Sequence, residues 1–138
     1  MKALSFHLSL PCLDVEQTKD FYVDKLGAAL GRKANQWLDI NLFGNQITFT
    51  QSGNFNFDFK SYKFENHILP SFHFGVIVDS KIFQGLKDRA AETNLKVYAE
   101  AEFLHSKPGE HEIIMITDPN GYHIEFKCFN NEGEVFAH

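Results

Sequence analysis

Three observations in the sequence predict an α+β fold made of two strand–helix–strand–strand–strand modules. A strand-like run with a Phe-His pair occurs twice, at residues 6–10 and 72–78, and the two histidines lie 66 positions apart in a chain of 138 residues. Each run is followed by a segment of helical periodicity, and each such segment by three strand-like segments. Self-similarity at about half the chain length indicates an internal repeat.

In the first module, Asp14 occupies the N-cap position of the expected helix, where its carboxylate can accept a hydrogen bond from a free backbone amide. Apolar residues then recur every three or four positions up to Leu26, and Gly27 is a typical stop signal. The strands expected after this helix cover residues 28–34, 36–42 and 46–51, with a turn at 43–45.

The second module repeats this order. Asp79 or Ser80 is the expected N-cap, the apolar positions recur through Ala91, and Asn94 is the expected C-terminal stop. The expected strands cover residues 95–103, 110–117 and 122–129. The sequence Asp-Pro-Asn-Gly at 118–121 predicts a turn between the last two strands, because proline fixes one dihedral angle and Asn-Gly tolerates positive φ.

We expect a single domain over residues 1–138, with a first module at 4–52 and a second at 71–129. The connecting segment, residues 53–70, is rich in aromatic side chains and has no helical period. Two interpretations are open for it: a linker that contains a strand, or an aromatic flap over a pocket.

Composition excludes several classes of partner. The net charge of −5 and the absence of any basic stripe argue against nucleic acid. The apolar runs are far too short to span a membrane, and the N-terminus lacks the long apolar stretch of a secretory signal. Two cysteines without zinc-finger spacing are typical of reduced thiols, so we expect a cytoplasmic protein.

The repeat also places polar side chains at equivalent positions. Aligning the modules on the glycines of their last turns makes Thr48 the counterpart of Glu125, and the two Phe-His pairs make His7 the counterpart of His73. A buried carboxylate is costly unless it is paired or bound to a metal. Three of these four positions hold metal-binding residue types, so the sequence predicts a metal site made by His7, His73 and Glu125.

Residues 6–8, 21–22 with 26–27, and above all 118–125 resemble the vicinal oxygen chelate superfamily, which includes glyoxalase I, extradiol dioxygenases, fosfomycin-resistance transferases and bleomycin-resistance proteins. Residues 37–46, 73–76 and 107–110 are similar to a subgroup described as extradiol-type dioxygenases. The resemblance implies paired βαβββ modules that form an incomplete mixed β-barrel around a divalent metal. It also implies a homodimer.

The ligand count favours an oxygenase. Related four-ligand enzymes carry Glu or Gln where this chain has Thr48, a poor ligand, so one side of the metal stays open. Two histidines and one carboxylate are typical of non-haem Fe(II) oxygenases, and we expect Fe(II) and a small aromatic diol as substrate. Gln46 could act as a fourth ligand after a register shift.

Three alternatives remain: an Mn(II)-dependent thiol or epoxide transferase, a glyoxalase-like enzyme with Mn(II) or Zn(II), or a small-molecule-binding protein without catalysis. Acid–base candidates near the metal are His123, Tyr122, His111 and His67, whereas His105 and His138 are set aside. Candidate substrate contacts are Phe43, Phe49, Thr48, Gln46 and Phe57. For Phe43 and Phe49, filling the core is an equal alternative.

Overall fold

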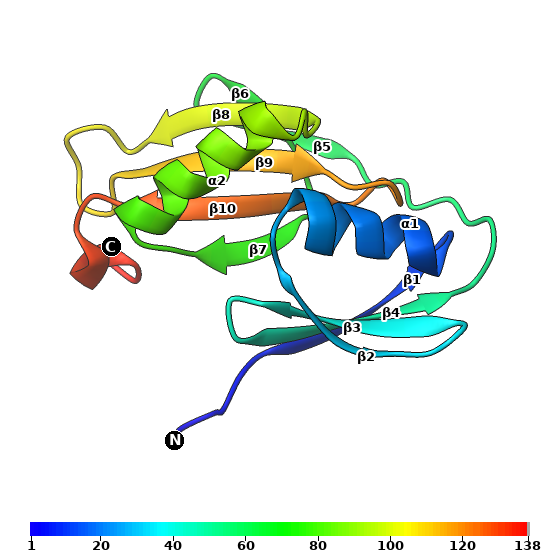
Figure 1. Cartoon of the computed structure of the whole chain (residues 1–138). Coiled ribbons are helices and arrows are strands. Elements are labelled where there is room, and N and C mark those ends of the chain that lie inside the picture. The colour runs from blue at the N-terminus through cyan, green and yellow to red at the C-terminus, as the bar shows by residue number, and fades with distance from the viewer. Residues whose placement is uncertain (138) are drawn as a thin grey trace. The chain divides into compact units, whose positions relative to one another are not determined.

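Two four-stranded sheets, one in each half of the chain, carry most of the secondary structure (Figure 1). The computed structural model describes residues 1–137, so His138 lies outside the described residues. The chain divides into a first unit, Met1–Asn56, and a second unit that begins at Phe57. Both sheets are open and each carries one βαβββ module, which confirms the predicted α+β class. No helix within residues 1–137 is long and apolar enough to cross a membrane.

The first unit has the strand order β1-β4-β3-β2, in which only the β1–β4 pair is parallel. On β3 and β4, buried Leu38, Ile40 and Phe49 alternate with polar residues, as expected for a sheet with one covered face. The helical segment covers that apolar face. The elements are β1 (His7–Cys12), α1 (Val15–Lys19), η1 (Asp20–Lys25), β2 (Ala29–Lys33), β3 (Trp37–Leu42) and β4 (Asn45–Gln51).

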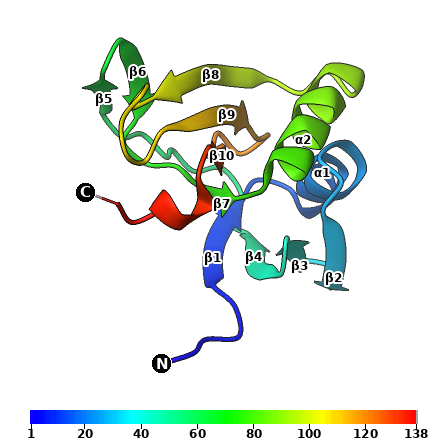
Figure 2. The same cartoon turned by 90° about the vertical axis from the view of Figure 1, so that its left-hand side faces the viewer.

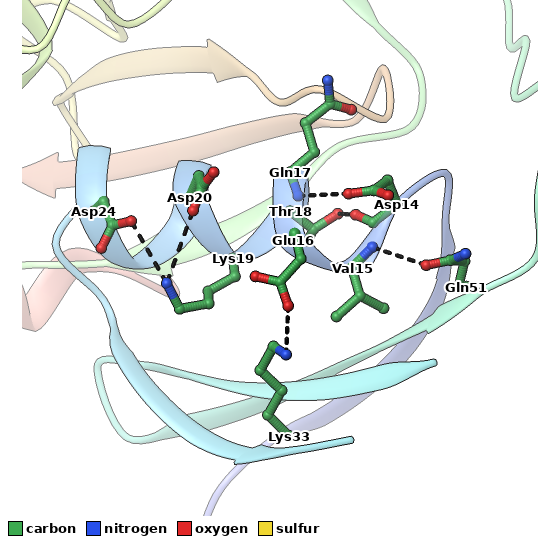
Figure 3. A network of polar contacts seen from close by, with 10 residues as sticks. All are labelled: Asp14, Val15, Glu16, Gln17, Thr18, Lys19, Asp20, Asp24, Lys33 and Gln51. Carbon is green, nitrogen blue, oxygen red and sulfur yellow. Dashed lines mark hydrogen bonds and ion pairs between the residues drawn. The ribbon is translucent and has the colours of Figure 1, made fainter. Parts of the chain in front are cut away.

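The first helix begins where the sequence predicts. The Asp14 carboxylate accepts a hydrogen bond from the Gln17 amide at 2.8 Å, and Lys33 of β2 reaches Glu16 in the first turn (Figure 3). After Lys19 the α-helix widens into the π-helix η1, a local change that the apolar period did not indicate. Gly27, with φ of +89°, follows the helix as expected.

The second unit has the corresponding order β7-β10-β9-β8, with β7 and β10 parallel and α2 along one face (Figure 2). Asp79 is the N-cap of α2 and accepts from the Ile82 amide at 2.8 Å, and Asn94 adopts positive φ after its end. The elements are β5 (Ser61–Phe64), β6 (His67–Pro70), β7 (Phe74–Ile77), α2 (Ser80–Glu92), β8 (Val97–Phe103), β9 (His111–Thr117), β10 (His123–Phe129) and η2 (Glu132–Glu134).

Most of the aromatic connecting segment belongs to the second unit. It forms the hairpin β5–β6, in which Leu69 packs against Phe103, Ile113 and Met115 of the large sheet. Met115 pairs directly with Glu125, so both side chains lie on the same sheet face. The hairpin therefore covers part of the face that carries the expected metal ligand.

Candidate metal centre

His73 stands directly before β7 and is half-buried. Its Nδ1 lies 2.9 Å from the carbonyl oxygen of Pro70, the last residue of β6. Because a carbonyl oxygen only accepts, Nδ1 carries the proton, and Nε2 is the ring nitrogen that remains for a metal or another proton. Metal-binding histidines are commonly held in this way, with the second ring nitrogen donating to a carbonyl group.

Glu125 lies in the middle of β10 and is only 5% exposed. Its Oε2 is 2.7 Å from His73 Nε2, and its Oε1 is 3.7 Å from Lys127 Nζ. A carboxylate with so little access to water needs a positive partner. The structure thus brings two of the three predicted ligands, His73 and Glu125, into direct contact.

The hydrogen bond to Glu125 raises the pKa of His73, burial opposes this, and the Pro70 carbonyl adds to the rise. Both ring nitrogens then face acceptors, so the pair requires a positive charge between Nε2 and the carboxylate. In the protein alone a proton supplies it. An imidazole nitrogen and a carboxylate oxygen are also ligands that divalent Fe, Mn and Zn accept, so this donor pair fits the expected metal.

The close approach of β7 to β10 depends on Gly75. Gly75 pairs directly with Glu125, and a Cβ atom at this position would overlap the Glu125 carbonyl oxygen. Only glycine allows the two backbones to lie so near each other. The sequence His73-Phe74-Gly75 therefore contains both the predicted ligand and the glycine that lets it meet Glu125.

The third expected ligand, His7, is an exposed residue on β1 of the first unit. Among residues 1–137, no group of three His, Cys, Asp or Glu side chains is assembled to hold a metal. His7 as the third ligand therefore stays a prediction.

Strand register supports the repeat that underlies this prediction. In the first unit His7 pairs with Gln46, and in the second Phe74 pairs with Ile124. Continuing the second register by one residue places His73 opposite His123. Thr48 then corresponds to Glu125, as the sequence alignment predicts.

The hydroxyl of Thr48 donates to Asp39 Oδ1 at 2.7 Å, and Gln46 Nε2 donates to Asp39 Oδ2 at 3.3 Å. The side chain of Gln46, the possible fourth ligand, and that of Thr48, at the fourth-ligand position, are thus bound to one carboxylate. Asp39, 5% exposed, is a functional candidate that the sequence reasoning missed. Its signal was a lone carboxylate among the apolar residues Leu38 and Ile40.

Tyr62 on β5 is a second missed residue. Burial, and then the negative charge of Glu125, raise the pKa of its phenol, so the Tyr62 hydroxyl stays protonated at neutral pH. The only indication in the sequence was that Tyr62 belongs to the aromatic connecting segment.

His123 and Phe57, an acid–base and a substrate-contact candidate, line one small cavity of about 120 Å³, together with Phe59, Phe72 and Tyr98. His123 Nδ1 is 3.1 Å from the Thr117 hydroxyl, and its ring packs on Tyr98 with centroids 4.6 Å apart. Burial, followed by the charges of Lys96 and His73, lowers the pKa of His123. Its imidazole is therefore neutral near pH 7.

The remaining candidates lie in packed surroundings or at a turn. Tyr122 is 1% exposed, and its ring packs edge-on against Phe57. His111 is buried, its Nδ1 lies 2.8 Å from the Gly109 carbonyl oxygen, and its ring stacks on Phe129. Phe49 has no exposed surface and packs on Tyr22. His67 packs edge-on against Phe103, and Phe43 is an exposed residue of the β3–β4 turn.

The sequence profile of the Glyoxalase/Bleomycin resistance protein/Dioxygenase superfamily matches residues 5–126. The chain belongs to this superfamily. This confirms the resemblance to the vicinal oxygen chelate proteins, whereas the extradiol-type subgroup stays a prediction. The comparison with curated protein sequences gives no match.

Solved structures of the superfamily share the fold over nearly the whole chain. The glyoxalase/bleomycin resistance protein/dioxygenase from Alicyclobacillus acidocaldarius is 26% identical, with a TM-score of 0.82 and coverage of 99% of this chain and 100% of that one. The fosfomycin resistance protein FosX from Listeria monocytogenes is 15% identical, with a TM-score of 0.67 and coverage of 97% and 98%. At that identity the similarity shows a common fold.

Proposed function

We propose that this superfamily member is a metal-dependent enzyme in which His7, His73 and Glu125 hold one divalent metal, with Fe(II) as the expected ion. The observation that carries the proposal is the contact between His73 Nε2 and buried Glu125 at 2.7 Å, with Nδ1 fixed by a backbone carbonyl. Thr48, at the position of a fourth ligand, is bound to Asp39, which supports a three-ligand centre with open positions.

The proposed reaction is an extradiol-type oxygenation of a small aromatic diol. Fe(II), when bound, supplies attachment for the two vicinal oxygens of the diol and electron transfer to dioxygen. His123 is the proposed proton acceptor, because its neutral ring lines a cavity together with Phe57 and is oriented by Thr117. The aromatic rings of that cavity would pack against a flat substrate and exclude water.

Metal content after anaerobic purification tests this proposal. We expect about one Fe per chain in the wild type and loss of the metal in Glu125→Ala. Glu100→Ala is the matched control, because Glu100 lies on β8 of the same sheet with a side chain that is 55% exposed. Uptake of O2 with catechol is the activity assay, and His123→Gln should slow it without releasing the metal.

A second candidate function is an Mn(II)-dependent thiol or epoxide transferase. The fold shared with the fosfomycin resistance protein FosX favours it. Mn in place of Fe, together with protection of cells against fosfomycin, would support this alternative. Zn would point instead to glyoxalase-like chemistry. If neither the wild type nor Glu125→Ala binds any metal after reconstitution, a non-catalytic small-molecule-binding function becomes the best account.

The proposed partners are a small-molecule substrate and a second copy of the chain. Many members of the superfamily form dimers, so we expect a mass of about twice 15.8 kDa in solution. Light scattering coupled to size-exclusion chromatography measures this mass, and a single peak at the mass of one chain would contradict the homodimer.

A further inference from the structure

The polar face of the first sheet carries a cavity of about 290 Å³ outside the predicted ligand set. Its lining includes Arg32 of β2, Asp39 and Asn41 of β3, and Gln46 of β4. A cavity of this size is close to the lower end of the range for small-molecule sites. All of its lining residues belong to the first unit.

A β-bulge directs Arg32 into this cavity. Leu30 pairs with Ile40 and Lys33 pairs with Leu38, so Gly31 and Arg32 together stand opposite the single residue Asp39. In a regular strand Arg32 would point to the helix-covered face, as Lys33 does when it reaches Glu16 (Figure 3). Bulges are known to redirect side chains in this way near functional sites.

Buried Asp39 fixes the orientation of the guanidinium. Asp39 Oδ2 accepts from Arg32 Nε at 3.1 Å, and the guanidinium carbon lies 5.5 Å from the centre of the Trp37 ring. The Arg32 side chain is nevertheless 77% exposed. Its two terminal Nη groups have no partner among residues 1–137, so four N–H donors of an oriented, planar cation remain for a ligand.

The neighbouring amide adds donors of its own. Asn41 Oδ1 accepts from the Gly44 amide at 2.7 Å, which leaves the Asn41 NH2 group without a protein partner in the described part of the chain. The cavity thus offers two groups of hydrogen-bond donors, the guanidinium of Arg32 and the NH2 group of Asn41. Both carboxylate oxygens of Asp39 already accept hydrogen bonds within the protein. Such a donor set recognises a planar oxyanion through two parallel hydrogen bonds.

We propose that this cavity binds the carboxylate of a small-molecule ligand, with the Nη groups of Arg32 as the charged donors and Asn41 beside them. The Arg32–Asp39 pair has no net charge, so a dianionic phosphate would bring two uncompensated negative charges and a carboxylate only one, which favours the monoanion. Asp39 is the positioning residue of this site.

The cavity lies on the same sheet face as His7. His7, Gln46 and Asn41 form one row across β1, β4 and β3, which are spaced about 4.8 Å apart, so Asn41 stands roughly 10 Å from His7. A carboxylate-bearing aromatic diol could span such a distance. That the carboxylate belongs to the substrate rests on the proposed function, whereas the carboxylate site itself does not.

Benzoate is the probe for this site, and benzamide is its neutral counterpart of the same shape. In 15N-labelled protein, benzoate should shift the Arg32 Nε–H resonance in a saturable way and bind about tenfold more tightly than benzamide. Arg32→Gln should weaken benzoate binding by about tenfold or more. Lys33→Gln is the matched control, since it removes the same charge from the same strand on the opposite face, and it should leave the affinity unchanged.

The variant Arg32→Lys distinguishes a loss of benzoate binding from a folding defect. It keeps a cation beside Asp39 but loses the planar fork, so we expect wild-type thermal stability together with weakened benzoate binding. Equal benzoate affinity in wild type and both Arg32 variants, or no saturable shift at millimolar benzoate, would overturn the inference. If the protein binds benzoate but holds no metal, the carboxylate site is supported and the proposed enzyme function is refuted. If the protein holds metal but does not bind benzoate, the enzyme function is supported and the carboxylate site is refuted.

Discussion

Replacing Gly75 by alanine tests the geometry on which the candidate metal centre depends. The added methyl group would overlap the carbonyl oxygen of Glu125, a backbone atom that cannot rotate away. Strands β7 and β10 must then separate, although β7 has only four residues with which to stay paired. Overpacking typically costs about 1–3 kcal/mol, and the backbone clash places Gly75→Ala at about 3 kcal/mol. For a chain of this size that lowers the melting temperature by roughly 10 °C.

The assay is thermal unfolding followed by circular dichroism, with metal titration of the same samples. Gly85→Ala is the matched control: Gly85 lies in α2 and a Cβ atom there meets nothing within 4 Å, so it should gain up to about 1 kcal/mol. Since strand separation would also pull Glu125 away from His73, Gly75→Ala should bind metal more weakly. A variant with wild-type melting temperature and metal affinity would refute the reasoning.

Three other outcomes follow from the polar contacts. Asp39→Asn should lower the free energy of unfolding in urea by about 1–3 kcal/mol near pH 7. Burial raises the pKa of Asp39, but its hydrogen bonds to Thr48 and Arg32 outweigh this, so the folded-state pKa lies below the unfolded value of 3.8. The stabilisation by the Asp39 carboxylate is therefore complete above pH 3.8 and is lost as the pH falls through the folded-state pKa, where the stabilities of wild type and variant should converge. Asp14→Ala and Asp79→Ala, which each remove an N-cap, should each cost about 1 kcal/mol, and equal stability to wild type would contradict the capping role. His123→Phe should abolish catechol-dependent O2 uptake while metal content stays unchanged, and retained uptake would exclude His123 as the proton acceptor.

Local signals in the sequence were sufficient for most of the fold. Asp14 and Asp79 begin the two helices, Gly27 and Asn94 follow their ends with positive φ, and the Asp-Pro-Asn-Gly sequence makes the turn into β10. These features could be predicted because each depends on one residue and its immediate neighbours. The observed strands of both sheets fall within a residue or two of the expected ranges.

The hairpin β5–β6 could not be predicted from local signals. Its turn contains Glu65 with φ of +52°, a residue that carries no turn signal of its own. The hairpin is stabilised instead by distant contacts, such as Leu69 on the cluster of Ile113 and Met115. The spacing of apolar residues in the sequence also did not indicate the π-helix after Lys19.

For the candidate site, the sequence by itself determined the fold family and the equivalence of Thr48 with Glu125, because a repeat preserves the order and spacing of its residues. The contact of His73 with Glu125 came from the tertiary structure. The tertiary structure alone also turned Arg32 toward Asp39. A single extra residue in β2 reverses the face on which a side chain lies, and strand pairing decides where that residue is accommodated.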